Sequence, residues 1–338
     1  MPTKSVVTFG EIMLRLSAPG FARFTQSTHF NVTYGGGEAN VANSLAHFGI
    51  PSTHVTRFPA NDLGKAATQF LQQNGVNTQA ILYGGDRLGI YFVEAGASSR
   101  ASRVLYDRDR SSFAQLEPGM IDWEDVLKEA QWFHWTGITP AISEGAALVC
   151  QEAIQIANRK GITVSADVNY RKNLWQYGKT VREVMPKLIE GCDLIIASEN
   201  DAADIFGISA EPGSTNNYMS VCQQLQQRFP RLKQIVTTHR GVISSSHNTL
   251  SAVLWNGREM IQSIEHTITP IVDRIGGGDA FMAGLIYGLL TYQEEKKALD
   301  FGLAASVLKH TIEGDVNLVT VLEVEALVKG ENIGRLVR

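Results

Sequence analysis

The chain has 338 residues, of which 44% are hydrophobic and 19% charged, so it holds one large or two ordinary globular domains and is not a disordered chain. Its formal net charge is −4 and no long basic run occurs, which argues against a nucleic-acid or anionic-membrane partner. Three widely spaced cysteines, no signal-peptide pattern and no apolar stretch of about 20 residues lead us to expect a cytoplasmic protein without a membrane span.

The N-terminal part of the chain predicts two strands and a helix. "SVVTFG" (5–10) is a β-branched run typical of a buried strand, and "MLRLS" (13–17) alternates as a half-exposed strand does. Small and apolar residues recur at helical spacing over 38–48, and Gly49 is a typical helix stop. Three glycines precede this predicted helix and Asn40 lies one turn into it, so a ligand can approach the backbone there.

Two regions contain alternating strands and no helix between them. They are residues 12–34 and 85–112, the second of which includes "GIYFVEAG" and "SRVLYD". Because strands without covering helices suggest a separate sheet, we predict a small β-sheet lid from these two regions. The core is then formed by residues 1–11, 35–84 and 113–338.

The middle of the chain alternates helices and strands. We predict helices over 147–161, 180–191 and 216–229, each followed by a strand, over 162–168, 193–198 and 234–238. Helices that alternate with continuous apolar strands indicate an α/β fold with a parallel sheet covered on both faces. After them, "LSAVLWNGREMIQS" (250–263) predicts a hairpin, because Asn-Gly is a strong turn signal.

Polar residues follow each of the three strands of this repeat. "DVNYR" (167–171), "SEND" (198–201) and "TTHRG" (237–241) come directly after apolar runs. Ligands bind α/β folds at the carboxyl ends of parallel strands. We therefore expect one rim of the sheet to collect Asn169, Arg171, Ser198, Asp201, Thr238 and Arg240.

"DRIGGGDAFMAGLIYGLL" (273–290) places three glycines and an aspartate before an apolar helix. The free N–H groups and the dipole of a helix start favour a bound anion, and glycines let it approach. Asp279 is then placed to accept a proton from a hydroxyl that attacks a phosphate. Taken alone, the segment is more typical of an ordinary helix N-cap. The chain has no Walker, complete GxGxxG, HExxH or GxSxG pattern.

Over nearly its whole length the chain resembles the ribokinase family of carbohydrate kinases. "DRIGGGD" is similar to the family's Asp-Thr-x-Gly-Ala-Gly-Asp motif, with Arg274 and Gly277 in place of Thr and Ala. "GGGEANVA" matches the glycine-rich helix entry, and Ser198 with Asp201 is a weakened Asn-x-x-Glu motif. The resemblance implies a three-layer α/β/α sandwich with a mostly parallel central sheet and a β-sheet lid. It also implies ATP and Mg²⁺, the metal held mainly by ATP phosphates and water, and a homo-oligomer, a dimer or higher, formed through the lid.

Within the family the chain most resembles the 2-keto-3-deoxygluconate kinases, on "FGEIMLRLS", "YGGGEANVA", "VLYDR", "TGITPAIS" and "DVNYR". The resemblance implies that Asp279 is the base, assisted by Arg171 and the glycines before the helix. The residues implied to bind the sugar acid are Gly36, Asn40, Tyr91, Tyr106, Arg108, Asn169, Arg171, Asp279 and Asp315. Those implied to bind the nucleotide are Ser198, Asp201, Thr238, Arg240, Gly241, Gly276, Gly277 and Gly278.

The charge of such a substrate agrees with this interpretation. A sugar acid carries a carboxylate, which Arg108 and Arg171 suit as fork-shaped cations. Alone, "DRDR" (107–110) equally fits a solvated strand edge, and Tyr91 with Tyr106 a cross-strand aromatic pair. The expected reaction is ATP-dependent phosphorylation of the acid's terminal hydroxyl, giving 2-keto-3-deoxy-6-phosphogluconate. The alternatives are a related kinase for fructose, ribose or a related deoxy sugar acid, or a non-catalytic sugar-binding regulator; a nicotinamide dehydrogenase is disfavoured.

Overall fold

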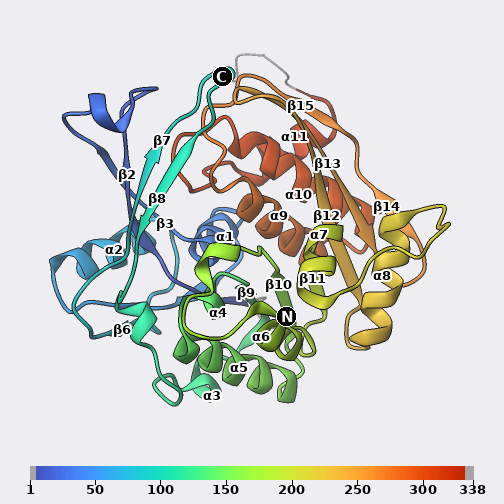
Figure 1. The fold of residues 1–338 in the computed structure, drawn as a ribbon, viewed down its shortest axis with the longest axis horizontal. Helices are drawn as coiled ribbons and strands as arrows, with labels where there is room; N and C mark the ends of the chain where they lie inside the picture. The colour runs from blue at the N-terminus through green and yellow to red at the C-terminus, as the bar shows by residue number, and fades with distance from the viewer. Residues whose placement is uncertain (1–4, 332–338) are drawn as a thin grey trace.

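A nine-stranded sheet forms the centre of the protein, whose computed structural model describes residues 5–331 (Figure 1). The strand order is β14-β13-β12-β11-β10-β9-β1-β4, with β15 beside β13. The neighbouring strands β4, β1, β9, β10, β11 and β12 are parallel, and β13, β14 and β15 are antiparallel additions at one end. Their bounds are β1 (Ser5–Phe9), β4 (Ser52–Val55), β9 (Ala130–Thr136), β10 (Thr163–Asp167), β11 (Leu194–Ile196), β12 (Gln234–Ser244), β13 (His247–Trp255), β14 (Met260–Gln262) and β15 (His266–Ile268).

Helices cover both faces of this sheet, as the alternating pattern predicts. The side chains of β9 alternate between the layers, because Phe133 packs with one set of helices and Trp132 with the other. On the first face lie α3 (Trp123–Val126), α5 (Glu144–Arg159), α6 (Val181–Ile189) and α8 (Asn217–Arg228). On the second lie α1 (Gly37–His47), α9 (Gly277–Thr291), α10 (Glu295–Lys309) and α11 (Val321–Val328). The predicted three-layer α/β fold is confirmed.

The smaller sheet is also present and has the order β3-β2-β7-β8, called the lid sheet below. Its strands are β2 (Met13–Ser17), β3 (Asn31–Gly35), β7 (Ile90–Glu94) and β8 (Arg103–Asp107). Parallel pairing of β2 with β7 joins segments that are distant in sequence. Leu14 packs against α1 and against α2 (Asp62–Gln73), so one end of the lid sheet rests on the main body. In Figure 1 it stands beside the large sheet.

Strand β12 is longer than the sequence predicts. The prediction ends it at Thr238, whereas the strand continues to Ser244 because β13 pairs with it antiparallel, Val242 facing Asn248. The extension overhangs β11, which ends at Ile196. "TTHRG" is therefore strand, although it still lies beyond the parallel part of the sheet.

The predicted hairpin is confirmed, since Asn256 Oδ1 accepts hydrogen bonds from the N–H groups of Arg258 and Glu259 at 3.0 and 2.9 Å. The remaining strands and α-helices of the described residues are β5 (Arg57–Phe58), β6 (Leu82–Tyr83), α4 (Thr139–Ile142) and α7 (Glu199–Asp201). Among the helices of the described part of the chain, none is long and apolar enough to cross a bilayer.

Candidate active site

The glycines at 276–278, called the glycine loop below, are packed from behind. Gly276 caps α9 with a left-handed φ of 82°, and a Cβ there would stand 2.0 Å from the carbonyl oxygen of Asp315. A Cβ on Gly277 would stand 2.5 Å from Cε1 of His310, whereas one on Gly278 would meet nothing within 4 Å. The loop is therefore fixed on its inner side and open on its outer side. The N–H groups of this first helical turn can receive an anion.

Asp279 stands where the first turns of α1 and α9 meet. Asn40 Nδ2 donates a hydrogen bond of 2.7 Å to Asp279 Oδ2. Gly37, the first residue of α1, lies beside this carboxylate, because a Cβ there would be in ordinary contact with Asp279 Oδ1 at 3.6 Å. The neighbouring Gly36 packs against backbone, since its Cβ would stand 2.0 Å from the carbonyl oxygen of Glu11. Two helix starts, each with partial positive charge, thus face one carboxylate.

The surroundings of Asp279 suit a base that works near neutral pH. Burial raises the pKa of Asp279 to about 7 and the hydrogen bond from Asn40 opposes the shift. The negative charges of Asp167, Asp315 and Glu38 add to the rise in the pKa. A carboxylate with such a pKa can both accept and release a proton at physiological pH.

Asp167 ends strand β10 and was missed by the sequence reasoning, although it opens the quoted segment "DVNYR". Asn169 has a φ of 34° and its N–H donates to Asp167 Oδ1 at 3.1 Å. Burial raises the pKa of Asp167 to about 7 and Asp201 adds to the shift, while the Asn169 bond and the charge of Arg171 oppose it. The exposed Arg171 therefore acts electrostatically on the same rim as Asp279.

Glu38 is a second acid that the sequence reasoning missed. Its Oε1 accepts hydrogen bonds from Thr136 N at 3.0 Å, Thr136 Oγ1 at 2.9 Å and Thr139 Oγ1 at 2.6 Å. Burial raises the pKa of Glu38, and the hydrogen bonds oppose the shift. These bonds tie α1 to the end of β9. The sequence signal that could have identified Glu38 is its position, because it is a charged residue between the three glycines and Asn40.

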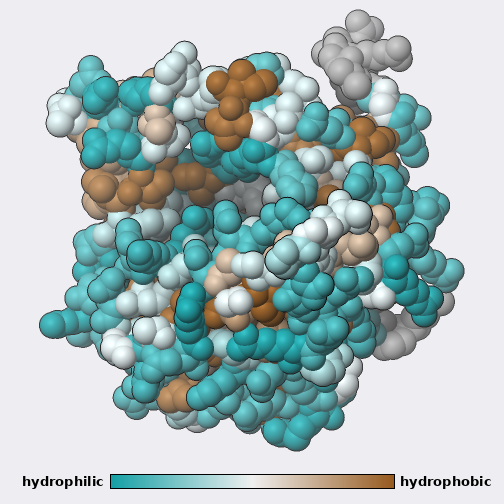
Figure 2. All heavy atoms as spheres, turned by 45° about the vertical axis from the view of Figure 1, so that its right-hand side comes forward, coloured by the Kyte–Doolittle hydropathy of each residue, from teal (hydrophilic) through white to brown (hydrophobic). Residues whose placement is uncertain are grey.

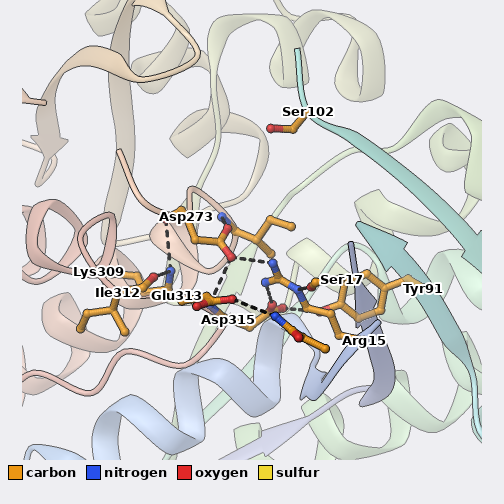
Figure 3. Close-up of polar contacts among 12 residues, drawn as sticks. Arg15, Ser17, Tyr91, Ser102, Asp273, Lys309, Ile312, Glu313 and Asp315 are labelled. Carbon is orange, nitrogen blue, oxygen red and sulfur yellow. Dashed lines mark hydrogen bonds and ion pairs between the residues drawn. The ribbon is translucent and has the colours of Figure 1, made fainter. Parts of the chain in front are cut away.

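The lid sheet meets the main body in a buried charged cluster (Figure 3). Tyr91 donates a hydrogen bond of 2.6 Å to Asp315 Oδ2, so these two predicted residues contact each other. Arg15 pairs with Asp315 through Nη1 and with Asp273 through Nη2, the latter at 2.5 Å. The sequence predicts a half-exposed strand here, but the Arg15 side faces inward and the residue is only 3% exposed. Two carboxylates compensate for the burial of its charge.

Arg108 follows β8 at the end of the lid sheet that rests on the main body, and it is already paired. Its Nε donates to Glu11 Oε2 at 2.8 Å, and its Nη2 pairs with the same oxygen. The guanidinium stands 5.9 Å from the ring centre of Tyr106, which stacks on Tyr91 at 6.0 Å. Tyr91 and Tyr106 are thus a cross-strand aromatic pair whose outer ring is exposed. Nothing in the sequence near Arg108 identified Glu11 as its partner.

The part of β12 that begins at Thr238 carries the residues expected to contact the nucleotide. Thr238 and Arg240 are exposed on one side of the strand, and Gly241 leaves space for Thr249, whose Oγ1 would be 2.5 Å from a Cβ at 241. Arg240 Nη2 is 3.3 Å from His310 Nε2. Burial lowers the pKa of His310 to about 4, so the ring is neutral. Because the carbonyl oxygen of Ser306 accepts from His310 Nδ1 at 2.6 Å, Nε2 is left to accept from Arg240.

Ser198 and Asp201 bind each other at the start of α7. Ser198 N and Oγ donate to Asp201 Oδ2 at 2.8 and 2.6 Å, and Asp201 N donates to Ser198 Oγ at 3.1 Å. This reciprocal capping engages one carboxylate oxygen of Asp201.

The face in Figure 2 is hollowed near its middle, with polar residues over much of the surface below the hollow.

Comparisons with known proteins agree with one another. The model of the "pfkB family carbohydrate kinase" matches residues 3–320. A 2-dehydro-3-deoxygalactonokinase from Haloferax volcanii is 29% identical over 332 residues, which cover 98% of this chain and 99% of that protein. The crystal structure of a 2-dehydro-3-deoxygluconokinase from Thermotoga maritima matches with a TM-score of 0.92 and 42% identity, covering 97% and 98%. A Xylella fastidiosa fructokinase with bound ATP, at 19% identity and a TM-score of 0.79 over 97% and 99%, shares the fold.

Proposed function

The chain belongs to the pfkB family of carbohydrate kinases, and we propose that it transfers the γ-phosphate of ATP to the terminal hydroxyl of 2-keto-3-deoxygluconate. The observation that carries the reaction is a carboxylate with a pKa near 7 beside the open glycine loop at a helix start. The choice of substrate is supported by the identity of 42% to the Thermotoga maritima 2-dehydro-3-deoxygluconokinase. 2-Dehydro-3-deoxygluconate and 2-keto-3-deoxygluconate are two names for the same sugar acid.

The chemical step divides between Asp279 and the glycine loop. Asp279 takes the proton of the terminal hydroxyl while the oxygen forms a bond to the γ-phosphorus, and the bond from that phosphorus to the bridging oxygen of ADP breaks. ADP leaves with the electron pair. The backbone N–H groups of the glycine loop stabilise the charge on the transferring phosphoryl oxygens. Asn40 keeps the carboxylate of Asp279 in position through its hydrogen bond of 2.7 Å.

We assign the carboxylate of the sugar acid first to Arg171. No salt bridge involves Arg171 within residues 5–331, whereas Arg108 is neutralised by Glu11. A free guanidinium gains more from a substrate carboxylate than one that must first release a partner. Arg108 then serves as a second cation at the lid, beside the exposed Tyr106. The other residues assigned to the sugar acid are Gly36, Asn40, Tyr91, Asn169 and Asp315.

We assign the nucleotide to the rim between β11, β12 and the glycine loop. Thr238, Arg240, Gly241 and Ser198 contribute from that rim. Asp167 and Asp201 suit a nearby divalent cation, since the charge of Asp201 raises the pKa of Asp167 and a cation would relieve the repulsion. They would hold its water ligands, as no cluster of three potential metal-ligating side chains occurs among the described residues. When bound, Mg²⁺ neutralises charge on the ATP phosphates.

We further propose that residues 12–34 and 85–112 act as a lid through which two copies pair. The face of the lid sheet opposite Arg15 carries one apolar residue from each strand in a single row, because Leu16 faces Val32 and Phe92, and Phe92 faces Leu105. Within this row, Leu16 also packs against the cluster that contains α1 and α2. Val32 is 59% and Leu105 51% exposed, so the row lies open at both ends. The three cysteines are buried and unpaired, which supports a reducing compartment such as the cytoplasm.

A panel of acceptors in a coupled ADP-release assay with magnesium ATP tests the proposal. We expect kcat/KM for 2-keto-3-deoxygluconate to exceed that for fructose and ribose by at least about tenfold, because a site built for a carboxylate rejects a neutral sugar. 2-Keto-3-deoxygalactonate is the matched second acid, and ³¹P NMR of the product locates the phosphate. A preference for a neutral sugar would support a related sugar kinase. Sugar binding without ADP release would support a regulator.

A further inference from the structure

Lys309 is buried without being part of the chemistry described above. It ends α10 and is 0% exposed, which is rare for a lysine because its ammonium loses hydration. Its Nζ donates to the carbonyl oxygens of Asp273 and Ile312, at 3.3 and 3.1 Å. Figure 3 shows Lys309 beside the cluster of Arg15 and the two aspartates.

The charges of this cluster balance. Arg15 and Lys309 are two cations, and Asp273 and Asp315 are the two anions that face them. Burial lowers the pKa of Lys309, and the charges of Asp273 and Asp315 oppose that shift. Removing Lys309 would leave a buried group with net negative charge directly behind the glycine loop.

The two carbonyl groups that Lys309 binds lie on the two segments that flank the glycine loop. Asp273 precedes Gly276 by three residues, and Ile312 precedes Asp315 by three. The carbonyl oxygen of Asp315 is the atom against which Gly276 packs, with room for no Cβ between them. One ammonium group therefore holds both walls of the loop.

We propose that Lys309 is a positioning residue for phosphoryl transfer. Its ammonium joins segments 273–276 and 312–315, and thereby places the N–H groups of the glycine loop and the carboxylate of Asp279. Lys309 touches neither substrate nor nucleotide and acts through these two segments. The choice of acceptor in the tests rests on the proposed function.

The charge of Lys309 separates this role from simple packing. Asp279 interacts electrostatically with charged groups from several elements, namely Asp167 on β10, Glu38 on α1, Asp315, and Lys309 on α10. Of these only Lys309 is positive, so its removal raises the pKa of Asp279 further. A substitution that removes the charge should then shift the acid limb of the kcat–pH profile, whereas a loss of packing alone would not.

The first experiment compares Lys309→Met with Lys309→Arg and with Lys297→Met, an exposed lysine on the same helix that pairs with Glu294. We expect Lys309→Met to lower kcat by about 10²-fold, as a loop displaced by about 1 Å would do. Its acid limb moves to higher pH. In Lys309→Arg the charge is kept, so the limb stays in place while kcat falls by about tenfold because the larger guanidinium displaces the two segments. Lys297→Met behaves as wild type.

The second experiment restores the missing group. In Lys309→Ala, propylammonium should occupy the vacated space and recover kcat in a saturable way, whereas the neutral isostere 1-propanol should not. Equal recovery by both additives would show that volume and not charge matters, and would overturn the proposal. Lys309→Met and Lys309→Arg carry the test if Lys309→Ala fails to fold, as judged by circular dichroism. Wild-type values of kcat and of the acid limb in Lys309→Met would also overturn it.

Binding of β,γ-imido-ATP, measured by calorimetry, separates this inference from the proposed function. This measurement needs no sugar acceptor, and we expect the affinity to fall in Lys309→Met and to be unchanged in Lys297→Met. An unchanged affinity in Lys309→Met counts against the positioning role. A wild-type protein that binds the nucleotide but phosphorylates no sugar acid defeats the proposed function alone.

Discussion

Asp279 combines a position at a helix start with a raised pKa, and its replacement by asparagine keeps the shape of the side chain. Because general-base catalysis contributes about 10²–10⁴-fold, we expect Asp279→Asn to lower kcat by that factor, measured in the coupled ADP-release assay. The matched control is Asp62→Asn, an exposed aspartate at the start of α2. Near-normal turnover in Asp279→Asn would remove Asp279 from the mechanism.

Asp279→Asn should not fail by unfolding. The folded chain keeps the proton of Asp279 up to about pH 7, whereas the unfolded chain releases it near the ordinary carboxyl value. The contribution of this group to stability therefore falls as pH rises between the two values. At pH 8 the variant avoids the buried charge, so its Tm should equal or exceed that of wild type.

The same raised pKa predicts how activity depends on pH. A base must be deprotonated to work, so kcat should rise with pH and level off above the pKa of about 7. Asp167 raises the pKa of Asp279 by repulsion, and Asp167→Asn should move this acid limb to lower pH. The measurement is a kcat–pH profile at saturating substrates. A limb that moves upward or stays fixed contradicts the electrostatic coupling between the two aspartates.

Residues whose surroundings are local could be predicted from sequence, and residues with distant partners could not. Asp279 follows three glycines and Asn40 comes shortly after three others, so adjacent residues in the sequence were enough to predict a ligand site at each. Arg15 and Lys309 look like ordinary exposed cations in the sequence. Their burial depends on the 273–276 and 312–315 segments, whose approach is a consequence of the complete fold.

At the scale of elements, β2 connects the lid sheet to the main body through Arg15. Removing one partner of a buried ion pair costs about 3–5 kcal/mol because the other charge remains buried. We expect Arg15→Met to lose that much free energy of unfolding in urea. The control, Arg103→Met, changes an exposed arginine on β8 and should cost less than about 0.5 kcal/mol. Equal stabilities for the two variants would mean that the cluster does not hold the lid sheet.

Element periodicity predicted most helices and strands, because apolar spacing is a local property. The alternation from α5 to β12 gave a parallel sheet covered on both faces, and two helix-free regions gave a second sheet. The predicted length of β12 was wrong, because the strand continues beyond Thr238 to Ser244. Its last six residues are polar or exposed and become strand only through pairing with β13, which no pattern within the segment indicates.

At the scale of the whole molecule, the two faces of the lid sheet have different surroundings. The face with Arg15, Tyr91 and Tyr106 is turned toward the main body and the site. The opposite face rests on α1 and α2 at its Leu14 end and carries the apolar row of Leu16, Val32, Phe92 and Leu105. Since the strands are shared, anything that covers the row also restrains the side chains of the site.

We therefore expect a dimer that the double variant Val32→Lys with Leu105→Lys dissociates, because two charges cannot be buried unpaired at a symmetric interface. Sedimentation equilibrium should give two chains for wild type and one for this variant. Val242→Lys, at an exposed valine on β12, should remain a dimer. Tyr106 follows Leu105 on β8 and stacks on Tyr91, a residue that we propose to bind the sugar acid, so dissociation should also raise KM for the sugar acid more than KM for ATP. A wild-type protein that sediments as a single chain at every concentration would refute the pairing of two lid sheets. It would also show that no second copy of this chain covers the apolar row.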